Sequence, residues 1–386
     1  MPSPLADAVP FDEVHRVLII KLRHHGDVLL TSPVLSVLKA HAPHIEIDAL
    51  VFADTAPMLT HHPALDELFV IDRAQKKRGI VKQLSSEWAL FQQLQSRDYD
   101  LVIHLTDHPR GAWLAKFLGA RWAVAPKRDK GARWWKKFFT HLYPVPGGGT
   151  RHTVECHLDA LRRIGIQATP AQRRLTLVAG SEAETHVRNL LAEYQLSVNG
   201  YIHFHPTSRW FFKTWPVAQN AKVLAALVAR GEHVVITAAP DKRECAMVDA
   251  ILEQAAMMAP DTNARAEANS IVNLAGKVSL KELSALTSHA KLFVGVDSAP
   301  MHIASAVDTP TVALFGPSGD KEWGPWMVPH EIVMSNAHPC RPCGQDGCGG
   351  GKVSDCLTAI PAERVLAAID RVLAMADNLA ADDPRR

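Results

Sequence analysis

Short apolar segments alternate with amphipathic segments along this chain of 386 residues, and this alternation restricts the fold more than any other feature. The segments at 33–41 and 87–96 carry apolar residues at helical spacing. Buried strands are expected in the first half at 16–22, 45–52, 67–72 and 99–105. Strands that alternate with helices in this way are typical of parallel sheets covered by helices. The sequence therefore predicts an α/β protein.

A second series of the same kind follows a connection near residues 167–200. Its strands are expected at 201–206, 233–240, 272–276, 291–298 and 311–318. The chain is longer than the roughly 250–300 residues at which a single hydrophobic core stops growing. We therefore expect two α/β domains, 1–178 and 179–360, and a closing helix and tail at 361–386.

The overall charge and hydropathy exclude several classes of protein. The 42 Lys and Arg residues against 40 Asp and Glu give a net charge of +2, so nothing global indicates a nucleic-acid-binding protein. No apolar run reaches the roughly 18 residues of a membrane span, and Pro4, Asp7 and Asp12 interrupt any signal peptide. We expect a cytoplasmic protein whose cysteines are mostly reduced.

Several polar or small residues stand where an expected strand has just ended. Ligands of open α/β sheets bind beyond the carboxyl ends of the strands, so these residues are predicted to converge in one crevice between the two halves. They are Asp27, Thr207, Ser208, Asp241, Asp297 and Gly316. No G-x-G-x-x-G follows a strand and no G-x-x-x-x-G-K-[ST] occurs, which disfavours a nicotinamide enzyme and a P-loop nucleotidase.

Asp27 lies at a strand-to-helix turn, directly after Gly26. One interpretation makes Asp27 a helix N-cap that accepts hydrogen bonds from backbone amides. The other makes it a general base that takes a proton from a substrate hydroxyl. A carboxylate is ionised at pH 7 in either case, although one that already accepts amide hydrogen bonds would be a poor base. The residues by themselves leave both interpretations open.

Three segments in this order carry a resemblance to a known family. They are LIIKLRHHGDVLLTSPVL (18–35), HFHPTSRWFFKTWP (203–216) and GVDSAPMHIASAVDTPTVALFGPS (295–318). Together they resemble the glycosyltransferase family 9 heptosyltransferases of lipopolysaccharide inner-core synthesis, in particular those that add the third heptose. The resemblance extends over nearly the whole chain.

The resemblance implies a GT-B fold, in which two Rossmann-like domains face a central cleft and the C-terminal one binds most of the donor. It implies inverting, metal-independent transfer of heptose from ADP-heptose to the lipopolysaccharide inner core, with no cofactor besides the donor. Transfer of the first or second heptose is an alternative within the same class. A sugar-nucleotide-binding protein without turnover is an alternative from another class.

The resemblance also assigns residues to the acceptor side and to the donor diphosphate. It places the catalytic base at Asp27, with Gly26 leaving room for the acceptor and His25 close by. Thr207, Ser208 and Lys213 are expected to hold the diphosphate, where hydroxyls and a cation stabilise the charge that develops on leaving ADP. Otherwise the two hydroxyls cap the next helix and Lys213 is solvated.

The third motif is expected to complete the donor site. Asp297 accepts hydrogen bonds from sugar hydroxyls, and amides at the following helix start hold a phosphate. The residues implied there are Asp297, Ser298, Ala299, Pro300, Met301 and His302, the last without a chemical role. The alternative is that Asp297 or Ser298 only caps the helix. Asp241 is expected to meet the adenosine ribose, or else to be an exposed turn residue.

Two patterns suggest a metal, and both are disfavoured. Asp98-x-Asp100 has the spacing of a manganese motif but precedes its expected strand, so we interpret it as a surface turn. Four cysteines form C-x2-C-x4-C-x7-C, which in a reducing compartment suggests zinc. They are Cys340, Cys343, Cys348 and Cys356. Their intervals are short for a structural zinc site and the resemblance requires no metal, so a metal-binding or redox-sensitive cluster is the minor alternative.

The segment KRDKGARWWKKFF (127–139) combines six cations, one acid and four aromatic residues. It is a solvated helix whose aromatic residues enter the core, or it is a contact surface. We favour peripheral contact with the inner membrane and the lipid-anchored acceptor, with exposed aromatic residues at the interface. The cations expected to meet the acceptor are Arg133, Lys136 and Lys137. Nucleic-acid binding is disfavoured.

Overall fold

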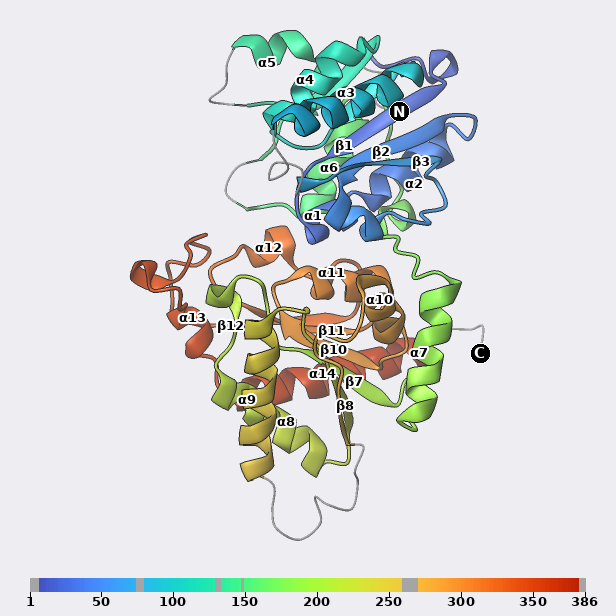
Figure 1. Cartoon of the computed structure of the whole chain (residues 1–386). Coiled ribbons are helices and arrows are strands. Elements are labelled where there is room, and N and C mark those ends of the chain that lie inside the picture. Colours follow the sequence, from blue (N-terminus) through green and yellow to red (C-terminus); the bar gives the residue numbers. More distant parts are fainter. Residues whose placement is uncertain (1–6, 74–79, 129–132, 147–148, 259–269, 382–386) are drawn as a thin grey trace. The chain divides into compact units, whose positions relative to one another are not determined.

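The computed structural model describes residues 7–73, 80–128, 133–146, 149–258 and 270–381. Contacts divide the chain into two compact units, Met1–Val178 and Ala179–Arg386, and each unit contains one six-stranded parallel sheet (Figure 1). The predicted α/β class with parallel sheets is therefore confirmed. Among the described helices, none is both long enough and apolar enough to cross a membrane.

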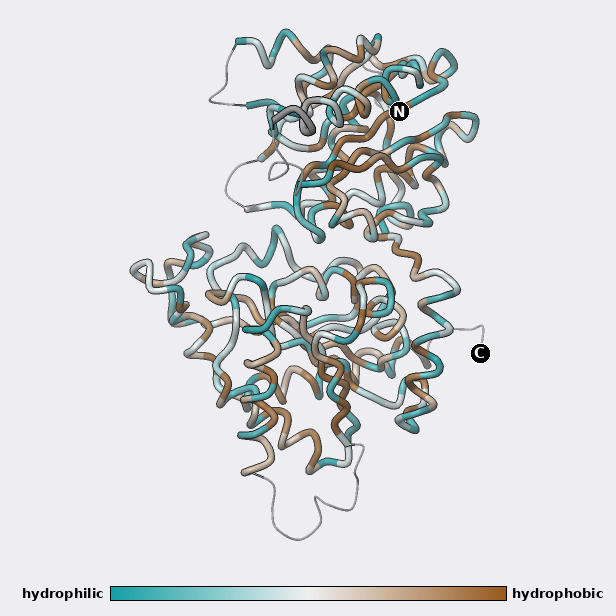
Figure 2. Tube along the Cα trace, in the orientation of Figure 1, coloured by the Kyte–Doolittle hydropathy of each residue, from teal (hydrophilic) through white to brown (hydrophobic). Residues whose placement is uncertain are grey.

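The N-terminal unit is built on a sheet whose strands run in the order β3-β2-β1-β4-β5-β6. Every neighbouring pair in it is parallel. The strands are β1 (Arg16–Lys21), β2 (Glu46–Phe52), β3 (Glu67–Ile71), β4 (Leu101–His104), β5 (Trp122–Pro126) and β6 (His141–Tyr143). Their central residues are apolar, as the brown traces show (Figure 2).

Helices cover both faces of this sheet (Figure 1). They are α1 (His25–Leu29), α2 (Ser32–His41), α3 (Ile80–Ser96), α4 (Pro109–Leu118), α5 (Arg133–Phe138) and α6 (Thr153–Arg162), with 3-10 turns η1 (Phe11–Glu13), η2 (Ala53–Met58) and η4 (Ala171–Arg173). On one face Leu94 of α3, Ala112 of α4 and Trp135 of α5 pack with Leu18 and Ile20 of β1. Helices α2 and α6 lie on the other face, where α6 contacts β5 and β6.

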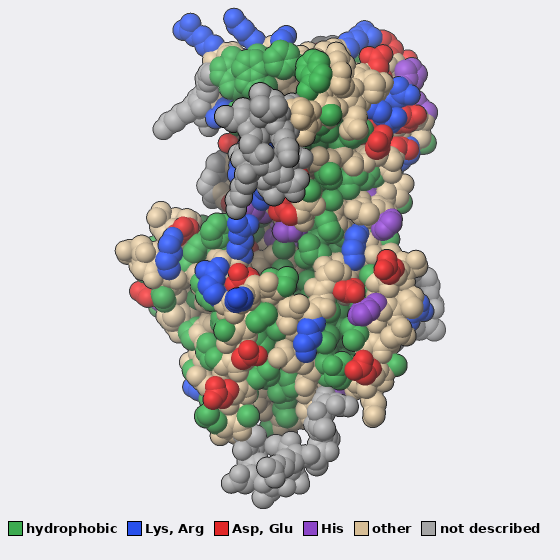
Figure 3. All heavy atoms as spheres, viewed as in Figure 1, with side chains coloured by type: hydrophobic (Ala, Val, Ile, Leu, Met, Phe, Trp, Pro, Cys, Tyr) green, Lys and Arg blue, Asp and Glu red, His purple; other side chains and the backbone are tan. Residues whose placement is uncertain are grey.

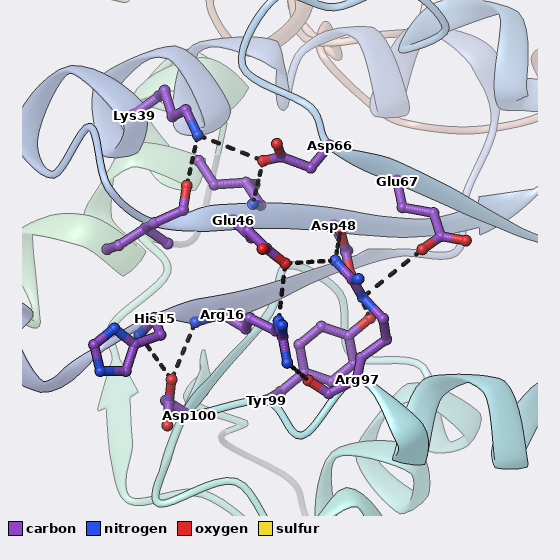
Figure 4. A network of polar contacts seen from close by, with 12 residues as sticks. His15, Arg16, Lys39, Glu46, Asp48, Asp66, Glu67, Arg97, Tyr99 and Asp100 are labelled. Carbon is purple, nitrogen blue, oxygen red and sulfur yellow. Dashed lines mark hydrogen bonds and ion pairs between the residues drawn. The ribbon is translucent and has the colours of Figure 1, made fainter.

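A buried carboxylate stabilises the amino end of this sheet (Figure 4). Asp48 on β2 is fully buried and accepts hydrogen bonds from Arg97 Nε and Tyr99 Oη, both at 2.8 Å. Nearby, Asp100 accepts the backbone amides of His15 and Arg16 at 2.7 and 3.0 Å. The carboxylate of Asp100 therefore supports the start of β1, at the edge opposite to the carboxyl ends of the strands.

The C-terminal unit has a sheet in the order β12-β11-β10-β7-β8-β9, again with all neighbours parallel. The strands are β7 (Tyr201–His205), β8 (His233–Ile236), β9 (Ile271–Asn273), β10 (Leu292–Val296), β11 (Thr311–Phe315) and β12 (His330–Met334). Both sheets thus contain one point at which the strand order reverses, between β1 and β4 and between β7 and β10.

Helices pack on both faces of the second sheet as well. They are α7 (Ser181–Glu193), α8 (Val217–Ala229), α9 (Lys242–Met258), α10 (Leu280–Ser288), α11 (Ala299–Ala306), α12 (Asp320–Trp323), α13 (Asp355–Thr358) and α14 (Ala362–Ala381), with 3-10 turns η5 (Phe211–Lys213) and η6 (Cys348–Gly350). One face joins Leu224 of α8 and Ile369 of α14 in the core. The other joins Val187 of α7, Leu286 of α10 and Val235 of β8. The closing helix α14 is therefore part of this unit's core.

The sequence patterns do not predict β5, β6 or β12. These strands lie toward the edges of their sheets. β6 has three residues, and β12 is mostly half-exposed or exposed with the polar pair His330 and Glu331 at its start. Such strands are paired by their neighbours and carry no long apolar run of their own.

Candidate active site

The two points of strand reversal carry most of the predicted site residues. In open α/β sheets these points open a crevice at the carboxyl ends of the strands, where ligands bind. Asp27 follows β1 in the N-terminal unit. Thr207 follows β7, and Asp297 follows β10, its neighbour in the C-terminal sheet. The topology therefore brings the motifs at 203–216 and 295–318 together within one unit.

Asp27 is the third residue of helix α1, not its N-cap. The N-cap is His24, whose side chain makes no capping hydrogen bond. Within the described part of the chain, the Asp27 carboxylate accepts no hydrogen bond, and its one charged contact is Lys21 Nζ at 4.0 Å. The Asp27 side chain is 21% exposed. The capping interpretation is therefore wrong, and the carboxylate keeps its lone pairs available for a ligand.

A buried lysine and a buried histidine lie beside this carboxylate. Lys21 Nζ donates to the backbone oxygen of Leu105 at 3.1 Å and lies 2.8 Å from His157 Nε2. Burial is the main reason that the pKa of Lys21 falls to about 8, opposed by the nearby charge of Asp27. Burial also holds the pKa of His157 well below its usual value. No pattern in the sequence indicated a role for either residue.

The other residues near Asp27 are held by polar contacts. His25 Nε2 lies 2.8 Å from the backbone oxygen of Asp54 in η2. Arg23 forms an ion pair with Asp107 at 2.8 Å, and the two residues follow the adjacent strands β1 and β4. Gly26 is the second residue of α1. Cations and carboxylates therefore surround the carboxyl end of β1.

In the C-terminal unit Lys213 and Asp297 form an ion pair. Lys213 Nζ donates to Asp297 Oδ2 at 2.7 Å. Asp297 is buried at 6% exposure, whereas the Lys213 side chain keeps 23% of its surface exposed. Lys213 is therefore not a solvated surface cation, and that alternative is wrong. The ammonium group of the partly exposed Lys213 side chain therefore lies near the carboxyl ends of β7 and β10, where the strand order reverses.

The hydroxyl groups of the second motif lie close to this pair in sequence and are not helix caps. Thr207 is fully buried and Ser208 is 5% exposed. Ser208 Oγ accepts the Trp210 amide at 3.3 Å, within a turn. The next α-helix, α8, starts later, with Pro216 as its N-cap. The interpretation that Thr207 and Ser208 cap this helix is therefore wrong.

A buried chain of histidines and threonines leads to Thr207. His203 lies 2.9 Å from Thr287 Oγ1 and 2.7 Å from Thr237 Oγ1. His205 Nδ1 lies 2.8 Å from the same Thr237 hydroxyl, and its Nε2 lies 3.5 Å from Thr207 Oγ1. Burial holds the pKa of His203 well below its usual value and lowers that of His205 to about 3, so both rings are neutral. Two histidines alternating on one apolar strand were the sequence signal for this chain.

The start of helix α11 offers fewer free amides than the sequence motif predicted. Pro300 has no amide hydrogen, and the Met301 amide already donates to the Ser298 carbonyl at 3.1 Å. Ser298 is the N-cap, but its hydroxyl donates to the Val296 carbonyl at 3.3 Å and caps no amide. Ala299 is the first residue of the helix, and His302, buried, is the fourth.

Asp241 caps helix α9. Its Oδ1 accepts the amides of Arg243 and Glu244 at 3.0 and 3.3 Å, and the Arg243 amide is the main reason that the pKa of Asp241 is lowered. Gly316 follows β11, where its carbonyl accepts Arg341 Nε at 2.6 Å. A Cβ at Gly316 would lie 2.6 Å from Leu357 Cδ1, so a larger residue there would force the Leu357 side chain to move.

The two metal patterns do not form a metal site in the described residues, where no group of three His, Cys, Asp or Glu side chains is placed to hold an ion. Asp98 has a left-handed φ of 51° in the turn before β4. The four cysteines are free thiols. Cys356 is buried, which raises its pKa, and Cys348 Sγ accepts the Asp355 amide at 3.4 Å.

The cationic segment 127–139 is only partly described, because residues 129–132 lie outside the described ranges. Arg133, Lys136 and Lys137 on α5 are exposed. Trp135 and Phe139 are buried in the core, contrary to the expected aromatic surface, whereas Trp134 and Phe138 are partly buried.

Exposed aromatic side chains come instead from α4. Trp113 and Phe117 are 47% and 61% exposed, and Trp113 stacks on Trp134 with ring centroids 5.8 Å apart. Figure 3 shows hydrophobic side chains gathered over this end of the N-terminal unit, with Lys and Arg side chains beside them. We call Trp113, Phe117, Arg133, Lys136 and Lys137 the α4–α5 surface.

Comparison with known proteins agrees with this arrangement. Residues 87–353 match the model of glycosyltransferase family 9 (heptosyltransferase). Lipopolysaccharide heptosyltransferase 3 of Escherichia coli is 36% identical over 356 residues, which cover 91% of this chain and 97% of that protein. Lipopolysaccharide heptosyltransferase 1 of Pseudomonas aeruginosa is 27% identical over 338 residues, covering 86% of this chain and 87% of that protein.

Solved structures show the same fold. A family 9 glycosyl transferase from Veillonella parvula superposes with a TM-score of 0.78 at 23% identity, covering 96% of this chain and 100% of that one. ADP-heptose lipopolysaccharide heptosyltransferase II of E. coli superposes with a TM-score of 0.71 at 20% identity, covering 94% and 99%. The protein therefore has the GT-B fold and belongs to glycosyltransferase family 9, the heptosyltransferase family.

Proposed function

We propose that this protein transfers heptose from ADP-heptose to the inner core of lipopolysaccharide, as the third heptose. The E. coli relative at 36% identity bears the name lipopolysaccharide heptosyltransferase 3, and this supports the choice of heptose. The observation that carries a catalytic function is the Asp27 carboxylate, which accepts no hydrogen bond among the described residues and lies at the strand reversal. A general base needs such unengaged lone pairs.

In the proposed reaction the Asp27 carboxylate takes the proton of an acceptor hydroxyl. The hydroxyl oxygen attacks the anomeric carbon of the heptose from the side opposite to the diphosphate, so the configuration inverts. The bond from that carbon to the diphosphate oxygen breaks, and its electron pair leaves with ADP. The positive charge that develops on the sugar ring and the negative charge on ADP are the features that the site has to stabilise.

Lys213, Thr207 and Ser208 are the proposed partners of the diphosphate. The exposed part of the Lys213 side chain allows its ammonium group to contact an anion while Asp297 holds it in place. The second carboxylate oxygen of Asp297 stays available to accept a hydrogen bond from a sugar hydroxyl. Residues 298–302 line the same strand end, and Asp241 is the proposed ribose contact. No metal is part of this proposal.

The experiment that tests the function uses purified protein, ADP-heptose and lipopolysaccharide acceptors truncated before each heptose. Mass spectrometry of the products is expected to show one added heptose on the acceptor that ends before the third. Addition to an earlier acceptor instead would assign first or second heptose transfer. Binding of ADP-heptose without product on any acceptor would support a non-catalytic sugar-nucleotide-binding protein.

Replacing Lys213 with methionine is expected to weaken ADP binding by at least about tenfold, because hydrogen bonds to charged groups contribute roughly 1.5–3 kcal/mol. Calorimetric titration with ADP measures this. Since Lys213→Met also leaves buried Asp297 without its cation, the double variant with Asp297→Asn serves as the control. The double variant is expected to recover thermal stability but not ADP affinity. Recovery of affinity would show that Lys213 acts only on the fold.

Chelation is expected to leave both ADP affinity and transfer unchanged. The prediction rests on the ammonium group of Lys213 and the hydroxyl groups of Thr207 and Ser208, which take the place of a metal ion at the proposed diphosphate site. The measurement is initial rate and ADP titration with and without EDTA. Loss of transfer in EDTA with recovery on adding manganese or magnesium would overturn the metal-free mechanism.

The α4–α5 surface is the proposed contact with the membrane-anchored acceptor, on the cytoplasmic face of the inner membrane. Exposed cations near an anionic surface each contribute on the order of 1 kcal/mol at low salt. Replacing Arg133, Lys136 and Lys137 with glutamine is therefore expected to raise the acceptor KM and reduce binding to anionic vesicles, with unchanged ADP affinity. Flotation with vesicles at low and high salt measures the binding.

A matched control removes three exposed cations from the other unit. The residues are Arg188, Lys222 and Arg364. Glutamine at these positions changes the net charge by the same amount but is expected to leave vesicle binding nearly intact. Equal losses in both triple variants would indicate a general charge effect and not a contact surface.

A further inference from the structure

The geometry around Asp27 points to a residue that acts through it. Lys21 ends strand β1 and is 5% exposed. Its ammonium group has three N–H donors. Two of them have fixed acceptors, the Leu105 carbonyl at 3.1 Å and His157 Nε2 at 2.8 Å. The third acceptor nearby is Asp27 Oδ1 at 4.0 Å, which is within ion-pair distance but too long for a hydrogen bond.

The partners of His157 settle which of its nitrogens accepts. His157 Nδ1 lies 2.9 Å from the backbone oxygen of Leu30, and a carbonyl oxygen only accepts. The Nδ1 atom therefore carries the hydrogen, and Nε2 has the lone pair that accepts from Lys21. His157 is buried in α6, which contacts β5 and β6 of the sheet that contains β1. The ring and the Leu105 carbonyl thus form a fixed cradle for the ammonium group.

We propose that Lys21, held by His157 and the Leu105 carbonyl, is a positioning residue that orients the Asp27 carboxylate and places a positive charge beside it. This inference rests on the proposed role of Asp27 as the base. The ammonium charge favours the carboxylate form. The 4.0 Å separation leaves the carboxylate lone pairs available for the acceptor hydroxyl. A direct hydrogen bond from Lys21 would occupy one of them.

The first variant removes the charge. Lys21→Met is expected to lower kcat by about 10- to 100-fold, the cost of a misplaced catalytic group, with acceptor KM and ADP affinity unchanged. The melting temperature is expected to fall modestly, because the Leu105 carbonyl and His157 Nε2 lose a buried donor. The acid side of the pH–rate profile is expected to move to higher pH, because the carboxylate loses a neighbouring positive charge.

The second variant removes the cradle. In His157→Leu, Lys21 loses one acceptor, and its ammonium group is expected to shift toward Asp27. The turnover number again falls, but the acid side of the profile moves to lower pH, opposite to Lys21→Met. A merely structural role for this pair predicts lower stability in both variants and no shift of the profile in either.

The alkaline side of the profile gives a further readout. As pH rises through about 8, Lys21 loses its proton, and wild-type kcat is expected to fall toward the value of Lys21→Met, which itself shows no such fall. The titratable and charged groups that face Lys21 are Arg23, Asp27, His104, Asp107, Cys156 and His157. Lys281→Met is the matched control, because burial also lowers the pKa of Lys281 to about 8 in the other unit.

The outcomes separate this inference from the proposed function. Normal turnover in Asp27→Asn would overturn the base itself. An inactive Asp27→Asn together with a Lys21→Met variant of normal kcat and unshifted pH profile would overturn only the positioning role. Product detection by mass spectrometry serves all variants, and Lys281→Met is expected to match wild type throughout.

Discussion

Asp27→Asn is expected to lower the turnover number by about 10³-fold, within the range that a general base contributes. Asparagine is nearly the same size but cannot accept a proton at neutral pH. Because the Asp27 carboxylate accepts no hydrogen bond in the described residues, the substitution is expected to leave the melting temperature and ADP affinity close to wild type. Single-turnover rates, a melting curve and an ADP titration measure the three quantities.

Asp100→Ala is the matched control for this variant. Asp100 is another aspartate of the same unit, but its carboxylate accepts the amides of His15 and Arg16. It should therefore behave as a capping residue does, with a lower melting temperature and nearly normal turnover. If Asp27→Asn showed that same pattern, the general-base assignment would have to be withdrawn.

Arg97→Met is expected to lower the free energy of unfolding by about 3 kcal/mol, the cost of leaving a buried carboxylate without its cation. Asp48 is fully buried and loses the 2.8 Å contact with Arg97 Nε, although Tyr99 still donates to it. For a unit of this size such a loss corresponds to a melting temperature lower by roughly 6–12 °C. Scanning calorimetry measures it.

Two further variants test whether the unpaired charge is the cause. The double variant Arg97→Met with Asp48→Asn removes both charges and keeps an acceptor for the Tyr99 hydroxyl, so it is expected to regain most of the lost stability. Arg371→Gln removes an exposed ion pair with Glu331 and is expected to change stability little. A double variant no more stable than Arg97→Met would contradict this account of the network.

Local sequence patterns predicted the central strands β1, β2, β4, β7, β8, β10 and β11 and the edge strands β3 and β9, but missed β5, β6 and β12. Runs such as 16–22 and 311–318 are apolar because the strands they form are covered on both faces. The edge strand β12 and the three-residue β6 have no such run. Their pairing depends on a neighbouring strand, and a single segment of sequence does not contain that information.

The aromatic residues of segment 127–139 are a second case in which the local sequence did not specify the structure. Spacing alone left open whether they face solvent or the core. The fold places α5 against α4 and the sheet, so Trp135 and Phe139 are buried and the exposed ring surface comes from Trp113 and Phe117. The membrane contact proposed for this surface stays a prediction.

The sequence by itself determined the class of fold, the family and the positions at which candidate residues leave their strands. These features are local, because strand and helix periodicity and the three motifs can each be found within a few dozen residues. Only the tertiary structure decided which side chains meet. Lys213 pairs with Asp297 across 84 residues and Lys21 with His157 across 136. Both contacts exist because β10 lies beside β7 and because α6 packs on the sheet that contains β1, and no local pattern in the sequence specifies that order.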